Sequence, residues 1–217
     1  MTMDAVDFAS LLCSRLCHDL LSPVGAMNNG LELLADEHDP AMREQVMGLL
    51  EDSASSSANK LKYYRLAFGA AGGFDSQIDA NEGKAVIEGL FCSKGKITLN
   101  WMVGAPTLGK PAIKVLLNLV LIAGDGLVRG GELTVGAETN GGITEMVVRA
   151  EGPRTILDPE IRKALLGELP ESEIASRGAA AWLARQLVLK HGGTIQASAP
   201  EEPFLLFGAT IGATPVG

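Results

Sequence analysis

Residues 11–34 read LLCSRLCHDLLSPVGAMNNGLELL, with an apolar residue at every third or fourth position. The same spacing begins slightly earlier, so the full apolar stripe comprises Ala9, Cys13, Leu16, Leu20, Val24, Met27, Leu31 and Leu34. Apolar residues spaced in this way fall on one face of an α-helix. We therefore predict a helix over residues 4–35, roughly 30 residues and about 45 Å long. Pro23 lies inside this helix, lacks a backbone donor, and is expected to bend the axis.

A second helix is predicted over residues 40–68, after a polar turn that contains His38. Asp39 suits the N-cap of this helix and Pro40 suits its first position. Its apolar stripe comprises Met42, Val46, Leu49, Ser53, Leu61, Tyr64 and Phe68. The glycine-rich residues 69–73 are expected to end the helix and to form a hinge.

Two long helices joined by a short turn form a helical hairpin. A single hairpin cannot cover its own apolar stripe, whereas two hairpins packed together make a four-helix bundle that covers both. We therefore predict that residues 1–73 form a dimerisation domain and that the protein is a homodimer.

From residue 74 to residue 217 the pattern changes to mixed helices and strands, which we assign to a second domain. Helices are predicted over residues 80–91, 111–123 and 176–190, and strands over residues 96–101, 132–138, 143–150, 194–199 and 204–211. Residues 139–142, TNGG, are predicted to join two of these strands by a turn. A mainly antiparallel sheet backed by helices is an α+β sandwich. The fold class is therefore α plus α/β, a helical hairpin followed by a sandwich.

The composition is that of a globular protein, with 47% hydrophobic and 20% charged residues among 217. A net charge of −8 argues against nucleic acid as the main partner, because a phosphate backbone repels an acidic surface. No apolar run is long enough to span a bilayer, and the acidic N-terminus does not resemble a secretory signal. We expect a cytoplasmic protein that has no membrane contact.

The cysteines at positions 13, 17 and 92 have no spacing typical of a disulfide framework. Cys13 and Cys17 share a helix face, but His18 is turned about 100° around the helix from Cys17. We therefore expect buried thiols and no metal site. His38 and His191 are expected to be turn residues without a catalytic role.

His18 points away from the apolar stripe, about 200° around the helix from both Leu16 and Leu20. Its face carries the small or polar residues Ser14, Arg15, Ser22, Gly25, Asn29 and Glu32. An exposed imidazole keeps a neutral, nucleophilic fraction at physiological pH. The commoner alternative is a solvated surface histidine without a function, and the helical pattern alone does not exclude it.

The run HDLLSP at residues 18–23 resembles the H-box of sensor histidine kinases, in which a phosphorylated histidine lies on the first helix of a dimerisation hairpin. The second domain resembles the kinase ATP-binding domain in outline, including the HGG junction at residues 191–193. However, Ile122 replaces the asparagine that helps to hold Mg²⁺ in the family. Ala150 replaces the aspartate that binds adenine, and Ala180 replaces a glycine of the phosphate-binding loop.

On these motifs the chain is identified as a member of the ChpT-type histidine phosphotransferases, which act in the cell-cycle phosphorelays of alphaproteobacteria. The resemblance implies a homodimer with a degenerate ATPase-like domain and no ATP-dependent kinase activity. In the family, the phosphoryl group passes from a receiver aspartate of a hybrid histidine kinase to the histidine. It then passes to receiver domains of response regulators. The resemblance implies that the protein binds no cofactor and that the receiver supplies Mg²⁺.

The resemblance also implies roles for single residues. His18 would carry the phosphoryl group and Asp19 would orient its ring. Arg15 would neutralise charge or contact the receiver, although a solvated surface charge is an equal alternative for it. The receiver is expected to dock on Leu11, Arg15, Leu21, Ser22 and Gly25, with further contacts from residues 42–50.

Two other functions remain open from the sequence. An active autokinase would need nucleotide contacts at Ile122, Ala150 and Ala180, whereas a non-catalytic scaffold would not need His18. The sequence also leaves open whether the degenerate domain contacts receivers or only braces the dimer.

Overall fold

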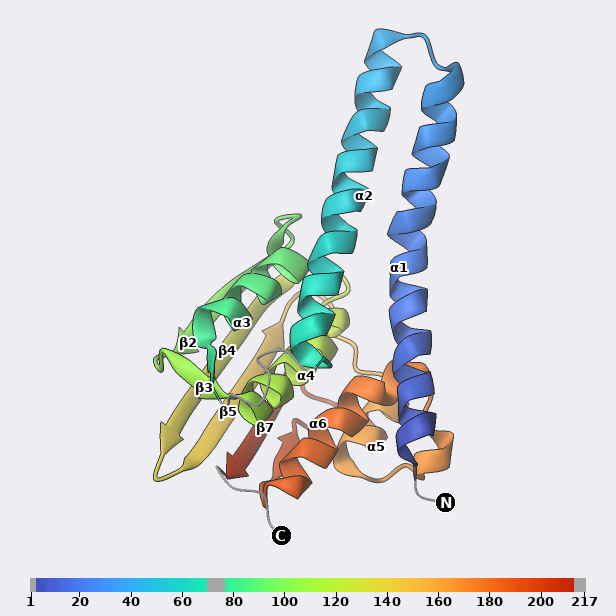
Figure 1. Ribbon diagram of the computed structural model, residues 1–217. Helices are drawn as coiled ribbons and strands as arrows, with labels where there is room; N and C mark the ends of the chain where they lie inside the picture. The colour runs from blue at the N-terminus through green and yellow to red at the C-terminus, as the bar shows by residue number, and fades with distance from the viewer. Residues whose placement is uncertain (1–2, 70–76, 213–217) are drawn as a thin grey trace.

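The computed structural model describes residues 3–69 and 77–212, in which two long helices rise from a compact α+β domain (Figure 1). Helix α1 (Ala5–Asp36) and helix α2 (Pro40–Ala67) form the predicted hairpin. The Asp4 side chain caps α1 and the Asp39 side chain caps α2, with Pro40 at its first position. These caps fix both helix starts within the polar segments that the sequence indicates.

Helix α1 continues through Pro23 without interruption. Near the top of the hairpin, Gly30 allows α2 to approach α1 closely, because a Cβ atom added there would lie 2.9 Å from Leu50 Cδ2. The predicted hinge extends beyond Gly69 into residues 70–76, so the hinge and the boundary predicted between residues 73 and 74 lie outside the described residues.

A five-stranded sheet forms one layer of the second part of the chain. It comprises β2 (Ile97–Val103), β4 (Gly131–Asn140), β5 (Ile143–Glu151), β7 (Phe204–Gly212) and β6 (Ile195–Ala197), in that spatial order. Strands β2 and β4 are parallel, and every other neighbouring pair is antiparallel. The predicted turn joins β4 to β5, where Gly141 and Gly142 have φ of 58° and 81°. Glycine suits this turn because it adopts positive φ without strain.

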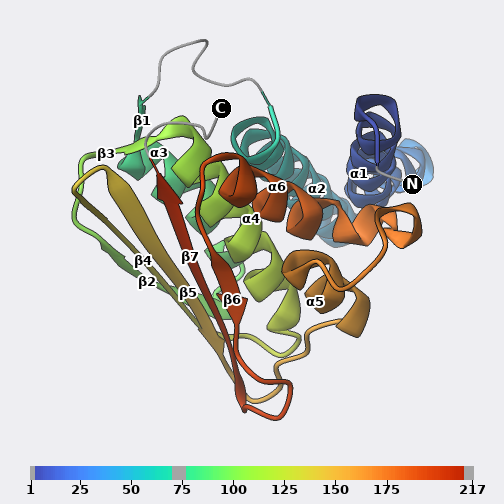
Figure 2. The ribbon, with the colours of Figure 1, turned by 90° about the horizontal axis from the view of Figure 1, so that it is seen from below.

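The helices cover one face of this sheet (Figure 2). They are α3 (Ala80–Ile87) with its π-helical extension η1 (Glu88–Cys92), α4 (Lys110–Gly126), α5 (Pro159–Leu166) and α6 (Ala179–Lys190), with the short turns η2 (Glu171–Glu173) and η3 (Ser176–Gly178) before α6. The predicted α+β sandwich is therefore confirmed. The sequence did not predict α5, nor the two-stranded sheet of β1 (Gln77–Asp79) and β3 (Thr107–Gly109).

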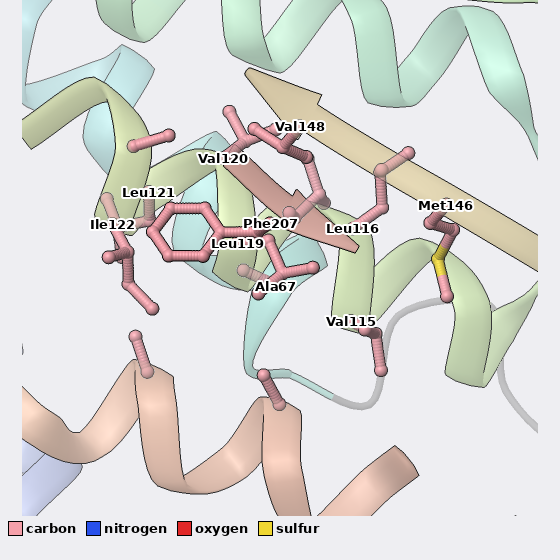
Figure 3. Packing of buried hydrophobic residues seen from close by; sticks show 14 of the residues in the cluster. Ala67, Val115, Leu116, Leu119, Val120, Leu121, Ile122, Met146, Val148 and Phe207 are labelled. Carbon is pink, nitrogen blue, oxygen red and sulfur yellow. The ribbon is translucent and has the colours of Figure 1, made fainter. Parts of the chain in front are cut away.

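Helix α4 is the centre of the hydrophobic core, and most of its residues are buried. Figure 3 shows its residues packed against Val148 of β5 and Phe207 of β7, with Ala67 of α2 in the same cluster. The base of α2 also buries Tyr63 and Leu66 almost completely. The hairpin is therefore anchored in the core of the second domain. Among the described residues, no helix is long and apolar enough to cross a membrane.

Candidate functional site

His18 lies on the lower half of α1, on the side that the helical wheel predicts. Its side chain is 76% exposed, so the imidazole is accessible to another molecule. Asp19 follows it directly, and its side chain is only 16% exposed. The two side chains are joined by a contact of 3.2 Å between His18 Nδ1 and Asp19 Oδ1.

Three side chains, those of Arg15, His18 and Tyr64, form hydrogen bonds with the Asp19 carboxylate. While Oδ1 faces His18, the other oxygen, Oδ2, accepts a hydrogen bond of 2.6 Å from Arg15 Nε and one of 2.5 Å from the Tyr64 hydroxyl. Burial alone would raise the pKa of Asp19, but the hydrogen bonds from Tyr64 and Arg15 outweigh it and hold the pKa below its ordinary value. The carboxylate is therefore ionised at neutral pH and can only accept hydrogen bonds.

This arrangement fixes the tautomer of the neutral His18 ring. Because Asp19 Oδ1 can only accept, His18 Nδ1 must carry the proton of their hydrogen bond. The proton of the neutral ring is then on Nδ1, and Nε2 keeps its lone pair. A lone pair on an exposed imidazole nitrogen is a nucleophile.

Pro23 contributes to the site through the backbone. In an α-helix each N–H bonds to the carbonyl four residues earlier, so the missing N–H of Pro23 leaves the carbonyl of Asp19 without its helical donor. Lys60 of α2 supplies a replacement, because its Nζ donates to this carbonyl at 2.6 Å. Asp19 is thus held by both its backbone and its side chain.

Arg15 links the hairpin to the second domain. Its side chain is 12% exposed, and its Nη2 donates to Asp125 Oδ2 of α4 at 2.8 Å. Burial would lower the pKa of Arg15, but the charges of Asp125 and Asp19 more than compensate and raise it. The alternative of a solvated surface charge is therefore wrong for Arg15. Its role toward a receiver remains a prediction.

A cavity of about 460 Å³ lies beside this network, between the hairpin and the second domain. His18 and Asp19 line it from α1, while Ile122 of α4 and Ala180 of α6 line it from the other side. Two of the three substituted nucleotide-site positions therefore face the same cavity as His18. Ala150 is fully buried in β5 and is not a lining residue of this cavity.

The predicted docking residues differ in their surroundings. Leu21 is 69% exposed, Ser22 is exposed, and a Cβ atom added to Gly25 would meet no atom within 4 Å. Leu11 is instead partly buried and packs against the core of the second domain. On α2, the predicted segment 42–50 exposes Met42, Met47 and Leu49 but buries Val46.

The prediction of buried thiols at Cys13 and Cys17 is wrong for the single chain, in which both are exposed. The α1–α2 hairpin does not cover this face of α1. Within residues 3–69 and 77–212, no group of three or more histidine, cysteine or acidic side chains is placed to hold a metal. His191 caps the end of α6 and is buried, whereas His38 is exposed in the turn between α1 and α2.

Sequence reasoning missed three residues of the site: Lys60, Tyr64 and Asp125. The helical periodicity assigns Tyr64 only to the apolar stripe of α2, and it indicates no partner for the hydroxyl group of Tyr64. Pro23 was a usable signal for Lys60, because it predicts a free carbonyl at position 19. Asp125 lies 110 residues from Arg15, and only the folded chain brings them together.

Comparisons with known proteins agree with this architecture. A family model described as the histidine phosphotransferase C-terminal domain matches residues 80–203. Protein phosphotransferase ChpT of Brucella abortus (strain 2308) is 37% identical over 174 residues, which cover 80% of this chain and 81% of the Brucella protein. A solved structure of a bacterial phosphotransferase is 33% identical, with a TM-score of 0.84 over 96% of this chain and 98% of that chain. The catalytic domain of the histidine kinase ThkA is 20% identical over 65% of this chain and 98% of that chain, with a TM-score of 0.48.

The pKa of Asp19 predicts how its contribution to stability depends on pH. Because the pKa is lower in the folded state than the unfolded value of about 3.9, the contribution is present above that pH and is lost as the pH falls through the folded pKa. We expect Asp19→Asn to lower the free energy of unfolding by about 1–3 kcal/mol at neutral pH. Urea unfolding of both proteins should show this difference narrowing below about pH 4.

The control for this comparison is Asp36→Asn, at the exposed end of α1. The free energy of unfolding of this variant should follow that of the wild type across the same pH range. A difference between Asp19→Asn and wild type that stays constant down to about pH 3 would contradict the role of the carboxylate charge.

Proposed function

Because the chain belongs to the histidine phosphotransferase family, we propose that His18 is the residue that carries its phosphoryl group. The observation that supports this most strongly is the exposed imidazole with Nδ1 held by the Asp19 carboxylate. A solvated histidine without a function would not need a neighbouring carboxylate that two other residues, Arg15 and Tyr64, hold in place.

In the proposed reaction, Nε2 of His18 attacks the phosphorus of an aspartyl phosphate on a receiver domain. The N–P bond forms as the P–O bond to the aspartate breaks, and the electron pair of that bond leaves with the receiver carboxylate. The proton on Nδ1 stays beside Asp19 and balances part of the charge of the phosphoimidazole. Reversal of these steps on a second receiver would pass the group onward.

Such a transfer needs positioning and charge neutralisation more than covalent chemistry from the protein. We assign the Mg²⁺ that neutralises the phosphoryl oxygens to the receiver. The exposed side chain of Leu21, with Ser22 and the open surface at Gly25, is the docking face that we propose for the receiver.

The partners are proposed from the resemblance. They are a receiver domain of a hybrid histidine kinase upstream and receiver domains of response regulators downstream, in a cytoplasmic relay that controls the cell cycle. The net direction of the transfer depends on the relative stability of the phosphoryl group on the two receivers.

An autokinase fits the site less well. Ile122 and Ala180 put apolar side chains on the cavity beside His18, where a kinase would need a Mg²⁺ ligand and an unobstructed phosphate loop. A non-catalytic scaffold would explain the exposed docking face but would not explain the hydrogen bonds around Asp19.

Phosphorylation assays with wild type and His18→Ala separate these functions. We expect wild type to be labelled by a phosphorylated receiver domain but not by labelled ATP alone. His18→Ala should lose all label from the receiver, because the nucleophilic nitrogen is gone.

His38→Ala, in the exposed turn of the hairpin, is the matched control and should be labelled like wild type. Label from ATP alone would instead establish a kinase. Absence of label from both donors in the wild type would favour the scaffold.

We also propose that the protein is a homodimer through its hairpin. Pro23 and Gly30 are the buried residues of α1, while Val24 and Leu31, which lie seven residues apart on one face of the helix, keep 41% and 58% of their surface exposed. An apolar surface of this extent favours association with another surface of the same kind. A second hairpin would cover it in a four-helix bundle.

Sedimentation equilibrium tests the dimer. We expect a mass of twice 22.7 kDa for the wild type, and a monomer for the double variant Val24→Glu/Leu31→Glu, whose charges would be desolvated in the bundle. Leu189→Glu is the control, because Leu189 is 49% exposed on α6, outside the hairpin. A wild-type monomer at concentrations of tens of micromolar would contradict the proposal.

A further inference from the structure

Resting on the proposed function, we propose that Tyr64 and Asp125 are positioning residues for phosphoryl transfer. Neither would touch the reacting atoms. Both act through Asp19, whose carboxylate sets the orientation and the tautomer of the His18 ring. The second domain therefore does more than brace the hairpin, because Asp125 comes from its central helix, α4.

The Tyr64 hydroxyl group is held at a fixed point by the packing of its ring. Tyr64 is 5% exposed, its ring stacks on Phe68 with 5.4 Å between centroids, and it meets Tyr63 edge-on at 6.2 Å. Burial raises the pKa of Tyr64, as does its hydrogen bond to Asp19, so the hydroxyl group keeps its proton and remains a donor. It therefore holds Asp19 Oδ2 and leaves Oδ1 to face His18.

Arg15 holds the same oxygen and is itself held by Asp125. Its Nε bonds Asp19 Oδ2 at 2.6 Å and its Nη2 bonds Asp125 Oδ2 at 2.8 Å. The guanidinium group is planar, so fixing one end fixes the direction of the other donor. Because α4 is packed into the core, Asp125 gives this chain of contacts a rigid end.

Removal of either support weakens the hold on the carboxylate, which then rotates more readily about its Cβ–Cγ bond. An unsupported carboxylate would divide its time between His18 and solvent, and the ring would then populate both neutral tautomers. Only the tautomer with the proton on Nδ1 leaves Nε2 available as a nucleophile. The hydrogen bonds to Asp19 Oδ2 thus influence which nitrogen of His18 carries the proton, although they do not contact the ring.

Nitrogen-15 NMR of the unphosphorylated full-length protein measures the tautomer directly, with His18→Ala used to assign the signals. In wild type we expect neutral His18 to be protonated at Nδ1. In Tyr64→Phe and Asp125→Ala, each of which removes one hydrogen bond of this chain of contacts, we expect a clear shift of the Nδ1 and Nε2 signals toward the other tautomer. Signals at wild-type positions in both variants would overturn the inference.

Transfer rates from a phosphorylated receiver domain give the second readout. We expect Tyr64→Phe to lower the rate at saturating receiver by roughly three- to tenfold, the net effect of one ordinary hydrogen bond, because the Arg15 hydrogen bond to the same oxygen remains. The receiver concentration at half-saturation should stay unchanged, because Tyr64 is buried and is not one of the proposed docking residues. A rise in that concentration at an unchanged maximal rate would overturn the positioning role.

Tyr63→Phe is the matched control. Tyr63 is the adjacent residue of α2, and its buried hydroxyl group donates to the carbonyl of Leu117 at 2.6 Å, apart from Asp19. The control should lose stability as Tyr64→Phe does but keep the wild-type tautomer and rate. An equal loss of rate in both variants would show a purely structural effect and overturn the inference. If wild type takes no phosphoryl group from the receiver, the proposed function fails, while the tautomer comparison still decides this inference.

Discussion

The Asp19 carboxylate connects three helices, α1, α2 and α4, whose relative positions must stay fixed. Its Oδ2 accepts from Arg15 on its own helix and from Tyr64 on α2, and through Arg15 it is connected to Asp125 on α4. Hydrogen bonds that involve charged groups are stronger than neutral ones, and partial burial reduces the screening of these charges by water. The carboxylate that contacts the exposed His18 is therefore held in place by largely buried side chains, although the His18 side chain itself is open to solvent.

Pro23 shows how a residue unfavourable to a helix can serve a site. Its missing N–H weakens α1 locally, yet the freed carbonyl of Asp19 becomes an acceptor for Lys60 of α2. The loss of one hydrogen bond within a helix is offset by one between helices. In this way the proline of the HDLLSP motif contributes to the contact between the two helices next to His18.

The parts of the fold predicted from sequence are those set by local patterns. The hairpin follows from a long apolar repeat, and the start of α2 follows from Asp39, whose side chain accepts a hydrogen bond from a nearby backbone amide. Strands β1 and β3 have three residues each, too few to show an alternating pattern. The exposure of His18 was predictable because it depends on helix geometry alone. The contacts of Tyr64 and Asp125 were not, since they join residues 45 and 110 positions apart.

The central claim is that Asp19 holds Nδ1 of His18 and leaves Nε2 to react. Direct identification of the phosphorylated atom tests it, by ¹⁵N and ³¹P NMR of the labelled protein after phosphorylation by a receiver domain. The account predicts a single phosphohistidine, at Nε2 of His18, with the proton retained on Nδ1. A phosphoryl group on Nδ1, or on any residue other than His18, would contradict it.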